Sequence, residues 1–282
     1  MPVSGGIELV VIGADGGPER AHAGSARAAD GARRLAAELP GRCFDAGARG
    51  SRVTLVAPEA DANAMLTALR AAAQRPARWL VVALLGQLVA DPRGRRLALV
   101  TGGSTPDNAY RRGLAWDWVV STMVHGDQEE TLLLVDAVAD KDAWGALERG
   151  EEGAGELLSH SRVPLWGRVA RYQPPRRGRD TVLPGGEGSF TWALDRVLEH
   201  GLPGAPAAVA PTDLQAAVET QLAWAESAYG VAGARLLAPG EQGRLLLRNR
   251  AAVRGALAGL SLSEELLAVL WRESAPMDPP SA

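Results

Sequence analysis

Apolar runs of strand length alternate with segments of helical periodicity through the first half of the chain. The predicted strands cover residues 7–13, 52–56, 79–85, 96–100 and 131–138. The predicted helices cover residues 25–39, 62–74 and 115–124, and Pro40 is expected to end the first of them. The run at 79–85 contains no polar residue, as expected for a central parallel strand that is covered on both faces. Because such alternation builds right-handed βαβ units, the pattern predicts a three-layer α/β sandwich, a mostly parallel central sheet with helices on both faces.

The second half of the chain contains longer loops between its regular elements. The predicted elements are a strand at 163–170, a helix at 189–200 ended by Gly201, a helix from 212 to 227, a strand at 245–247 and a helix at 261–271. Thr212 and Gln215 have the spacing of a capping box, which predicts the start of the 212–227 helix. No linker demands two independent domains. We expect one α/β domain at 1–252, followed by a helical extension and tail at 253–282.

Charge and hydropathy narrow the possible classes of function. The chain has 30 Lys and Arg residues against 33 Asp and Glu, and its net charge of −3 argues against a general nucleic-acid binder. No apolar run reaches about 18 residues, and the first residues lack the basic and apolar regions of a signal peptide. We therefore expect a cytoplasmic protein whose partners are neither nucleic acid nor membrane.

Residue types that commonly bind metals are few in this chain and scattered along it. Cys43 is the single cysteine, which excludes an internal disulfide and a cysteine-based zinc site. No two of the four histidines are spaced as a ligand pair. Asp136, Asp140 and Asp142 crowd the end of a predicted strand and could hold Mg²⁺, but the last two fit the start of the next helix better. We predict neither a metal nor a cofactor.

Two glycine-containing turns could bind an anion through backbone N–H groups. Residues 13–17 (GADGG) follow a predicted strand but lack G-x-G-x-x-G spacing and a lysine, so a tight turn into the following helix is favoured. Residues 101–105 (TGGST) follow another predicted strand and are interpreted as a turn or a loop beside a groove.

Several segments, taken in order, resemble the caspase-like family of caspases, metacaspases and their bacterial relatives. These segments are residues 29–36 (ADGARRLA), 55–69 (LVAPEADANAMLTAL) and 188–194 (GSFTWAL), with the helix from Thr212 following at the expected distance. The similarity extends over about 7–252. It implies the caspase-like three-layer sandwich, with a histidine and a nucleophilic cysteine at the carboxyl ends of two neighbouring strands.

The two positions that the resemblance assigns to this dyad hold other residues. Gly86 is followed by Gln87 where the family has histidine, and Asp136-Ala137 is followed by Val138 where the family has cysteine. Glutamine does not titrate at neutral pH, and valine carries no nucleophile. The resemblance therefore implies a pseudo-peptidase without catalytic residues, which acts as a binding, scaffold or regulatory protein on a protein or peptide partner.

Two alternatives remain open. The first is a hydrolase on the same scaffold with relocated chemistry, using Ser104, Thr105 or a carboxylate such as Asp136, although the sequence supplies no evident base. His125 is interpreted as a solvated residue at a helix end, and Cys43 as a small buried residue remote from the site. The second alternative is a small-ligand binder of a general Rossmann-like type.

Two further features could contact a partner. An arginine-rich region around one Gly/Pro loop could dock an acidic partner, or could be a solvated flexible loop. Its members are Arg168, Arg171, Arg176, Arg177 and Arg179. The apolar stripe of the 261–271 helix could dock in a partner's groove, or could pack on its own domain. Its members are Leu262, Leu266, Leu267, Leu270 and Trp271.

Overall fold

The structure is a computed structural model that describes most of the chain. The described residues are 6–14, 25–43, 50–91, 93, 96–105, 108–149, 158, 162–172, 183–229, 234–237 and 245–252. The predicted extension at 253–282, with its apolar stripe, and Arg176, Arg177 and Arg179 lie outside these residues. The division into a domain and an extension therefore stays a prediction.

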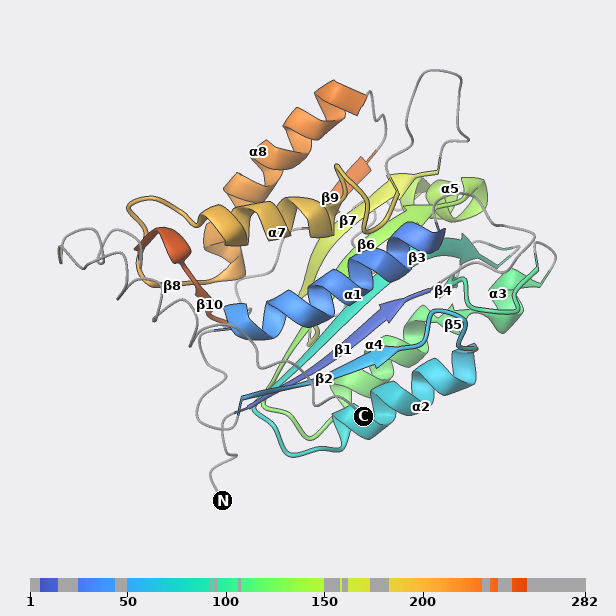
Figure 1. Ribbon diagram of the computed structural model, residues 1–282. Helices are drawn as coiled ribbons and strands as arrows, with labels where there is room; N and C mark the ends of the chain where they lie inside the picture. The colour runs from blue at the N-terminus through green and yellow to red at the C-terminus, as the bar shows by residue number, and fades with distance from the viewer. Residues whose placement is uncertain are drawn as a thin grey trace, which may run out of the picture.

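A twisted central sheet forms the middle layer (Figure 1). Its strands, in spatial order, are β2 (Ser51–Val56), β1 (Ile7–Gly13), β3 (Trp79–Ala90), β6 (Glu130–Ala139), β7 (Leu165–Arg171) and β9 (Ala234–Leu237). The first five run parallel, and β9 pairs antiparallel with β7. β4 (Leu97–Leu99) turns back antiparallel along the end of β3, and β5 (Leu114–Ala115) pairs with β4. A separate small sheet joins β8 (Ala208–Val209) to β10 (Leu247–Arg248).

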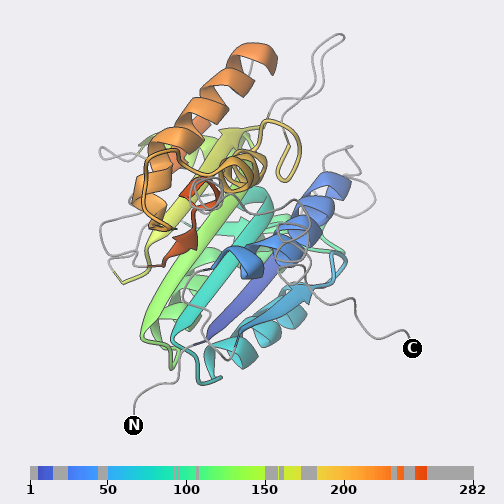
Figure 2. The same ribbon diagram turned by 60° about the vertical axis from the view of Figure 1, so that its left-hand side comes forward.

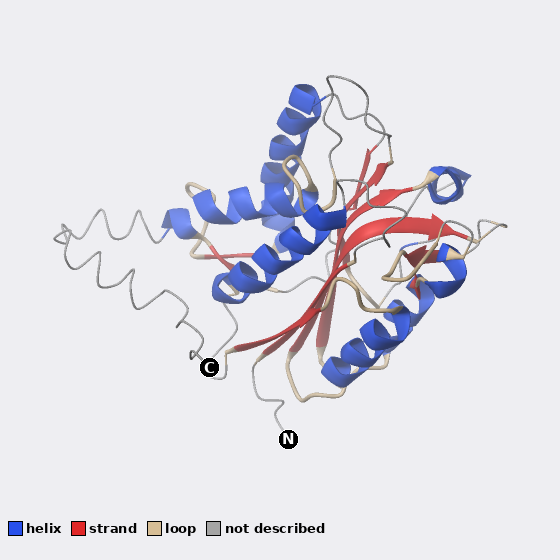
Figure 3. Cartoon of the chain, turned by 45° about the vertical axis from the view of Figure 1, so that its right-hand side comes forward, coloured by secondary structure: helices blue, strands red, loops and turns tan. Residues whose placement is uncertain are grey.

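Helices cover both faces of the sheet, as Figures 2 and 3 show from two sides. One face, called here the α1 face, is covered by α1 (Ser25–Arg42), α7 (Phe190–His200) and α8 (Pro211–Tyr229). The other, called the α2 face, is covered by α2 (Ala62–Ala73), α4 (Trp116–Val124) and α5 (Lys141–Arg149). The short helix α3 (Ala109–Arg112) follows β4. The predicted three-layer α/β sandwich with a mostly parallel sheet is confirmed.

The two cores arise from the pleat of the central strands. In β3, Val81 and Leu85 belong to the core under α1, whereas Leu80 and Leu84 belong to the core over α2. Successive side chains of a strand point to opposite faces, so a strand buried between two helical layers must be apolar at every position. This is the physical reason for the uninterrupted apolar run at 79–85.

Local signals fixed several helix ends as predicted. Asp61 caps α2 by accepting a hydrogen bond from the N–H of Ala64 at 2.8 Å. Gly201 ends α7 with φ of 74°, a conformation that favours glycine. Asp140 accepts a hydrogen bond from the N–H of Ala143 at 2.8 Å, so it begins α5 as expected.

The ends of two helices differ from prediction. Pro40 lies within α1, which continues to Arg42, because the last turn still buries Leu39 against the core. The predicted capping box at Thr212 and Gln215 is wrong, since α8 already begins at Pro211. Proline suits the first turn of a helix, where its missing N–H costs nothing.

The side chains near the start of α8 have other roles. The carboxylate of Asp213 accepts a hydrogen bond from the N–H of Ala210 at 2.8 Å, which ties down the chain just before the helix. The side chain of Gln215 instead accepts a hydrogen bond from the indole N–H of Trp166 at 2.7 Å. It therefore links α8 to β7 rather than capping its own helix.

Gly13 lets α1 lie close to the sheet. A Cβ atom at this position would lie 2.5 Å from the Cβ of Ala32 and 2.6 Å from the carbonyl oxygen of Ala28. No side chain fits in that space, so the glycine that ends β1 has a packing role. Asp15, Gly16 and Gly17 of the same predicted turn lie outside the described residues.

Candidate functional site at the carboxyl edge of the sheet

Gln87 and Val138 lie opposite each other on the two central strands. Their Cα atoms are register partners in the parallel pairing of β3 with β6, and Gly86 is paired with Ala137 one residue earlier. Leu85 and Leu134 belong to the core on the α1 face, so the strand pleat also places Gln87 and Val138 on that face. We call these two residues the strand-end pair.

The strand-end pair sits within the ladder rather than after it. β3 continues three residues past Gln87, because the N–H of Val100 donates to the carbonyl oxygen of Gln87 at 2.8 Å and β4 extends the pairing. The N–H of Asp140 donates to the carbonyl oxygen of Leu88 at 3.1 Å. Val138 is 6% exposed and Gln87 is half-buried. The backbone that carries the pair is therefore held on both sides, and the side chains supply an amide beside an apolar surface.

Asp136 lies on the same face of β6, two residues before Val138, and is buried. One of its carboxylate oxygens accepts three hydrogen bonds, listed here by donor: the N–H of Gly185 at 3.0 Å, the N–H of Thr191 at 3.0 Å and the hydroxyl of Thr191 at 2.5 Å. The carboxylate thereby joins β6 to the first turn of α7 and to the loop before it. Asp136 therefore anchors this loop. The Asp-Ala pair in the sequence does not indicate this role.

The loop at 183–189 is held from its other side by α1. The guanidinium of Arg34 donates to the carbonyl oxygen of Gly185. Gly185 has φ of 73°, and a Cβ there would lie 2.4 Å from the carbonyl oxygen of Arg27. Glycine is thus required by both conformation and space, and the loop forms a fixed wall on the α1 face beside the carboxyl edge.

Arg168 is a buried residue of β7 and is 2% exposed. It is the register partner of Asp136, and it donates to the carbonyl oxygen of Gly188 at 2.8 Å and to the carboxylate of Glu226 at 2.9 Å. Burial lowers the pKa of Arg168, while the charges of Glu226 and Asp136 act in the opposite direction. The interpretation of Arg168 as part of a solvated basic region is wrong, because its place in a central strand directs it under α8. Arg171, at the end of β7, is exposed.

Ser104 and Thr105 belong to a turn held by local hydrogen bonds. Ser104 is 4% exposed, and its hydroxyl oxygen lies 3.4 Å from the N–H donor of Thr101 and 3.3 Å from the Thr101 hydroxyl. The N–H of Thr105 donates to the side chain of Asn108 at 2.8 Å. These contacts fit the turn interpretation and bring no imidazole or carboxylate to either hydroxyl.

His125 and Cys43 lie away from the carboxyl edge. His125 is the exposed residue that ends α4, with a ring nitrogen 2.7 Å from the carbonyl oxygen of Ser121, and it precedes the amino end of β6. Cys43 is 2% exposed at the end of α1, where its thiol donates to the carbonyl oxygen of Leu39 at 3.3 Å. Among the described residues, no group of three or more potential ligands could hold a metal ion.

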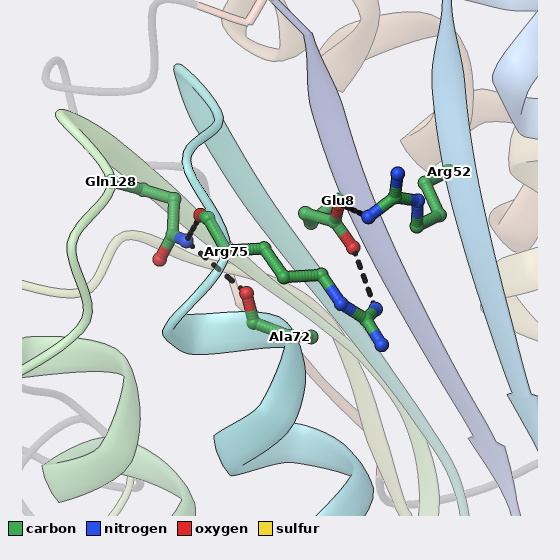
Figure 4. A network of polar contacts seen from close by, with 5 residues as sticks. All are labelled: Glu8, Arg52, Ala72, Arg75 and Gln128. Carbon is green, nitrogen blue, oxygen red and sulfur yellow. Dashed lines mark hydrogen bonds and ion pairs between the residues drawn. The ribbon is translucent and has the colours of Figure 1, made fainter.

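The amino edge of the sheet carries a separate polar network (Figure 4). Glu8 is buried under the α2 face and pairs with Arg75 at 3.1 Å and Arg52 at 3.4 Å. Gln128 donates to the carbonyl oxygens of Ala72 at 3.2 Å and Arg75 at 2.6 Å, which caps the end of α2. These contacts fasten β1, β2 and α2 together, so we assign them a structural role.

A pocket of about 130 Å³ also opens at the amino edge, between α4 and the starts of β6 and β7. It is lined by Met123, Val124, Gln128, Glu129, Glu130, Thr131, Arg162 and Pro164. It lies at the opposite end of β6 from the strand-end pair. No helix in the described part of the chain is long and apolar enough to cross a membrane.

Comparisons with known proteins find similarity in three-dimensional structure. The sequence matches no protein-family model and no curated protein. Among solved structures, the chain is similar to the crystal structure of caspase-1 from Spodoptera frugiperda, with 15% sequence identity and a TM-score of 0.38. The match covers 77% of this chain and 75% of that one. At this identity and TM-score it says nothing about activity or about the role of any residue.

Proposed function

We propose that this chain is a catalytically inactive caspase-like protein that acts by binding. Its partner is a protein or peptide held at the carboxyl edge of the sheet, and its role is that of a scaffold or regulator. The proposal starts from the order of sequence segments that resemble the caspase-like family. The observation that carries it is the strand-end pair, where Gln87 and Val138 stand opposite each other on neighbouring strands.

The chemistry of the strand-end pair supports binding rather than bond cleavage. A glutamine amide donates and accepts hydrogen bonds but does not exchange a proton with a nucleophile at neutral pH. A valine side chain offers only apolar contact. An extended peptide across this edge would find the half-buried amide of Gln87 to orient it and the wall at 183–189 that Asp136 and Arg34 hold in place.

The contacts of the residues that could replace a lost dyad also support the proposal. One carboxylate oxygen of Asp136 already accepts three hydrogen bonds, and the Ser104 hydroxyl accepts a hydrogen bond within its own turn. A nucleophile needs a base within hydrogen-bond reach, usually about 2.6–3.2 Å. His125 lies at the other end of β6 and is too remote from either group to supply one.

The proposal can be tested with a thiol placed at the strand-end pair. In a Cys43→Ala background, Val138→Cys leaves one thiol at the edge, and Trp118→Cys serves as a control at an exposed position of α4. We expect a thiol-directed peptide probe, scaled to the rate of iodoacetamide, to label position 138 at least about tenfold faster than position 118. Equal scaled rates at the two positions would contradict peptide binding at this edge.

Turnover by the unmodified chain distinguishes this proposal from a hydrolase with relocated chemistry. We expect no hydrolysis of reporter peptides ending in Arg or Asp. Hydrolysis that is lost in Ser104→Ala but kept in Cys43→Ala would overturn the inactive assignment. The double change Gln87→His with Val138→Cys then asks whether the edge still accepts a dyad, and its activity would be compared with that of Val138→Cys alone.

A further inference from the structure

β2 is the outer strand at one end of the sheet. Six consecutive residues pair in parallel with β1, from Ile7 opposite Ser51 to Ile12 opposite Val56, without a bulge. In the described part of the chain, β1 is the one strand that β2 contacts. Its outward N–H and C=O groups therefore have no strand partner there, and such a row is a template for pairing with another strand.

Apart from one arginine, the features that usually protect an outer strand are missing from β2. Its sequence, SRVTLV, has neither proline nor glycine. Its one charged residue, Arg52, is ion-paired with Glu8 on the α2 face, as Figure 4 shows. Natural edge strands are commonly blunted by charges, proline or bulges. The edge of β2 is regular and carries no unpaired charge.

One face of β2 also exposes two large apolar side chains. Val53 is 37% exposed and Leu55 is 43% exposed. Their register partners on β1, Leu9 and Val11, are 2% and 0% exposed, because α1 covers β1. Exposed apolar groups beside an open backbone edge favour a neutral, apolar strand as occupant.

We propose that β2 pairs antiparallel with β2 of a second copy of this chain, so that the sheet continues across a two-fold axis. Directly opposite residues of an antiparallel pair share a face, which limits the possible registers. A register centred on Thr54 sets Val53 against Leu55 of the second copy and Leu55 against Val53 of the second copy. The four exposed apolar side chains then form one cluster on the α1 face.

The same register avoids a charge conflict. Arg52 stands opposite Val56 of the second copy, and the two Arg52 Cα atoms lie about 13 Å apart along the strands. A two-fold axis closes the assembly at two chains, whereas a parallel, head-to-tail pairing would leave a further open edge. β2 therefore matches its own outer edge in direction, in polarity and in charge. The proposal is independent of the proposed function.

Sedimentation equilibrium of the full chain tests the proposal. From about 1 µM to about 100 µM we expect the mass to rise from that of one 29.5 kDa chain toward that of two. Leu55→Glu should shift this rise to at least about tenfold higher concentration, because it places a carboxylate in the apolar cluster. Trp118→Glu, the same kind of change at an exposed residue of α4, should leave the rise unchanged. A monomer throughout, or a dimer equally affected by both variants, would overturn the proposal.

A disulfide at the two-fold axis provides a second, independent test of the pairing. In a Cys43→Ala background, Thr54→Cys should form a disulfide-linked dimer under mild oxidation, since directly opposite Cα atoms lie within the range that a disulfide spans. Val56→Cys in the same background is the control and should cross-link poorly. Hydrogen exchange adds the last outcome. Protection of the outward-facing β2 amides, those that do not pair with β1, in a purely monomeric sample would assign the edge to another segment of the chain and refute the pairing.

Discussion

Removal of the Asp136 carboxylate should strongly destabilise this protein. The carboxylate accepts three hydrogen bonds and lies beside the buried guanidinium of Arg168. In Asp136→Ala the N–H groups of Gly185 and Thr191 lose their acceptor inside the protein. Arg168, 2% exposed, also loses a nearby opposite charge and keeps its ion pair with Glu226.

The expected size of the effect follows from these contacts. Leaving a buried N–H group without an acceptor costs about 1–3 kcal/mol, so the loss of the acceptor for Gly185 and Thr191 should cost about 2–6 kcal/mol in Asp136→Ala. Thr191→Val removes one hydroxyl donor and keeps both N–H bonds, so it should cost about 1.5–3 kcal/mol. Asp142→Ala, an exposed acid in the first turn of α5, should stay within about 0.5 kcal/mol of the unmodified protein.

Urea unfolding followed by circular dichroism and by tryptophan fluorescence measures all three variants. Coincident transitions from the two probes would justify a free energy of unfolding for each. We expect the midpoint to fall in the order Asp142→Ala, Thr191→Val, Asp136→Ala. If Asp136→Ala unfolded within about 1 kcal/mol of Asp142→Ala, the carboxylate would not be the anchor of the wall at 183–189.

Two further predictions concern pH and backbone space. Burial, followed by the hydrogen bond and repulsion from Glu38, raises the pKa of Asp195 from 3.8 to about 6. The folded state thus binds this proton more tightly than the unfolded state. Protonation of Asp195 therefore contributes fully to the free energy of unfolding below pH 3.8, and this contribution is lost as pH rises through 6. Asp195→Asn should therefore become more stable relative to the unmodified protein as pH rises from 4 to 7; melting temperatures that shift in parallel would contradict this. Gly167→Ala should prevent folding, because its Cβ would lie 1.9 Å from the carbonyl oxygen of Val135. Gly204→Ala, which meets nothing within 4 Å, should cost only about 1–3 kcal/mol for its positive φ, and similar expression and melting of the two variants would refute the packing argument.

The strand-end pair shows which part of the candidate site could be predicted from the sequence. The sequence identified Gln87 and Val138 through the Gly and the Asp-Ala that precede them, and the structure sets the two residues side by side in the ladder. Their loss of catalytic function stays a prediction. The sequence did not indicate that β3 continues beyond Gln87, because that extension depends on pairing with β4, a short strand whose direction no local pattern reveals.

The wall on the α1 face could not be derived from the sequence. Asp136 is separated by 49 residues from Gly185 and by 55 from Thr191. A hydrogen bond across such a separation leaves no periodic signal. The sequence does not distinguish a buried arginine such as Arg168 from an exposed one, because the environment of the side chain depends on which helix covers its strand. The segment at 188–191 (GSFT) contributes to the family resemblance, but its sequence does not indicate that Asp136 accepts the hydrogen bond of its threonine.

The sequence by itself determined the alternation of strands and helices, the burial of the central strands on both faces, and the helix ends at Asp61 and Gly201. These features depend on contacts within a few residues and on the repeat of a helix or strand, so a linear pattern records them. The tertiary structure decided the partners of Asp136 and Arg168, the true start of α8 and the open edge at β2. Each of these depends on which distant segments the sheet brings together. The residues that make such contacts are far apart in the sequence, so no local pattern records them.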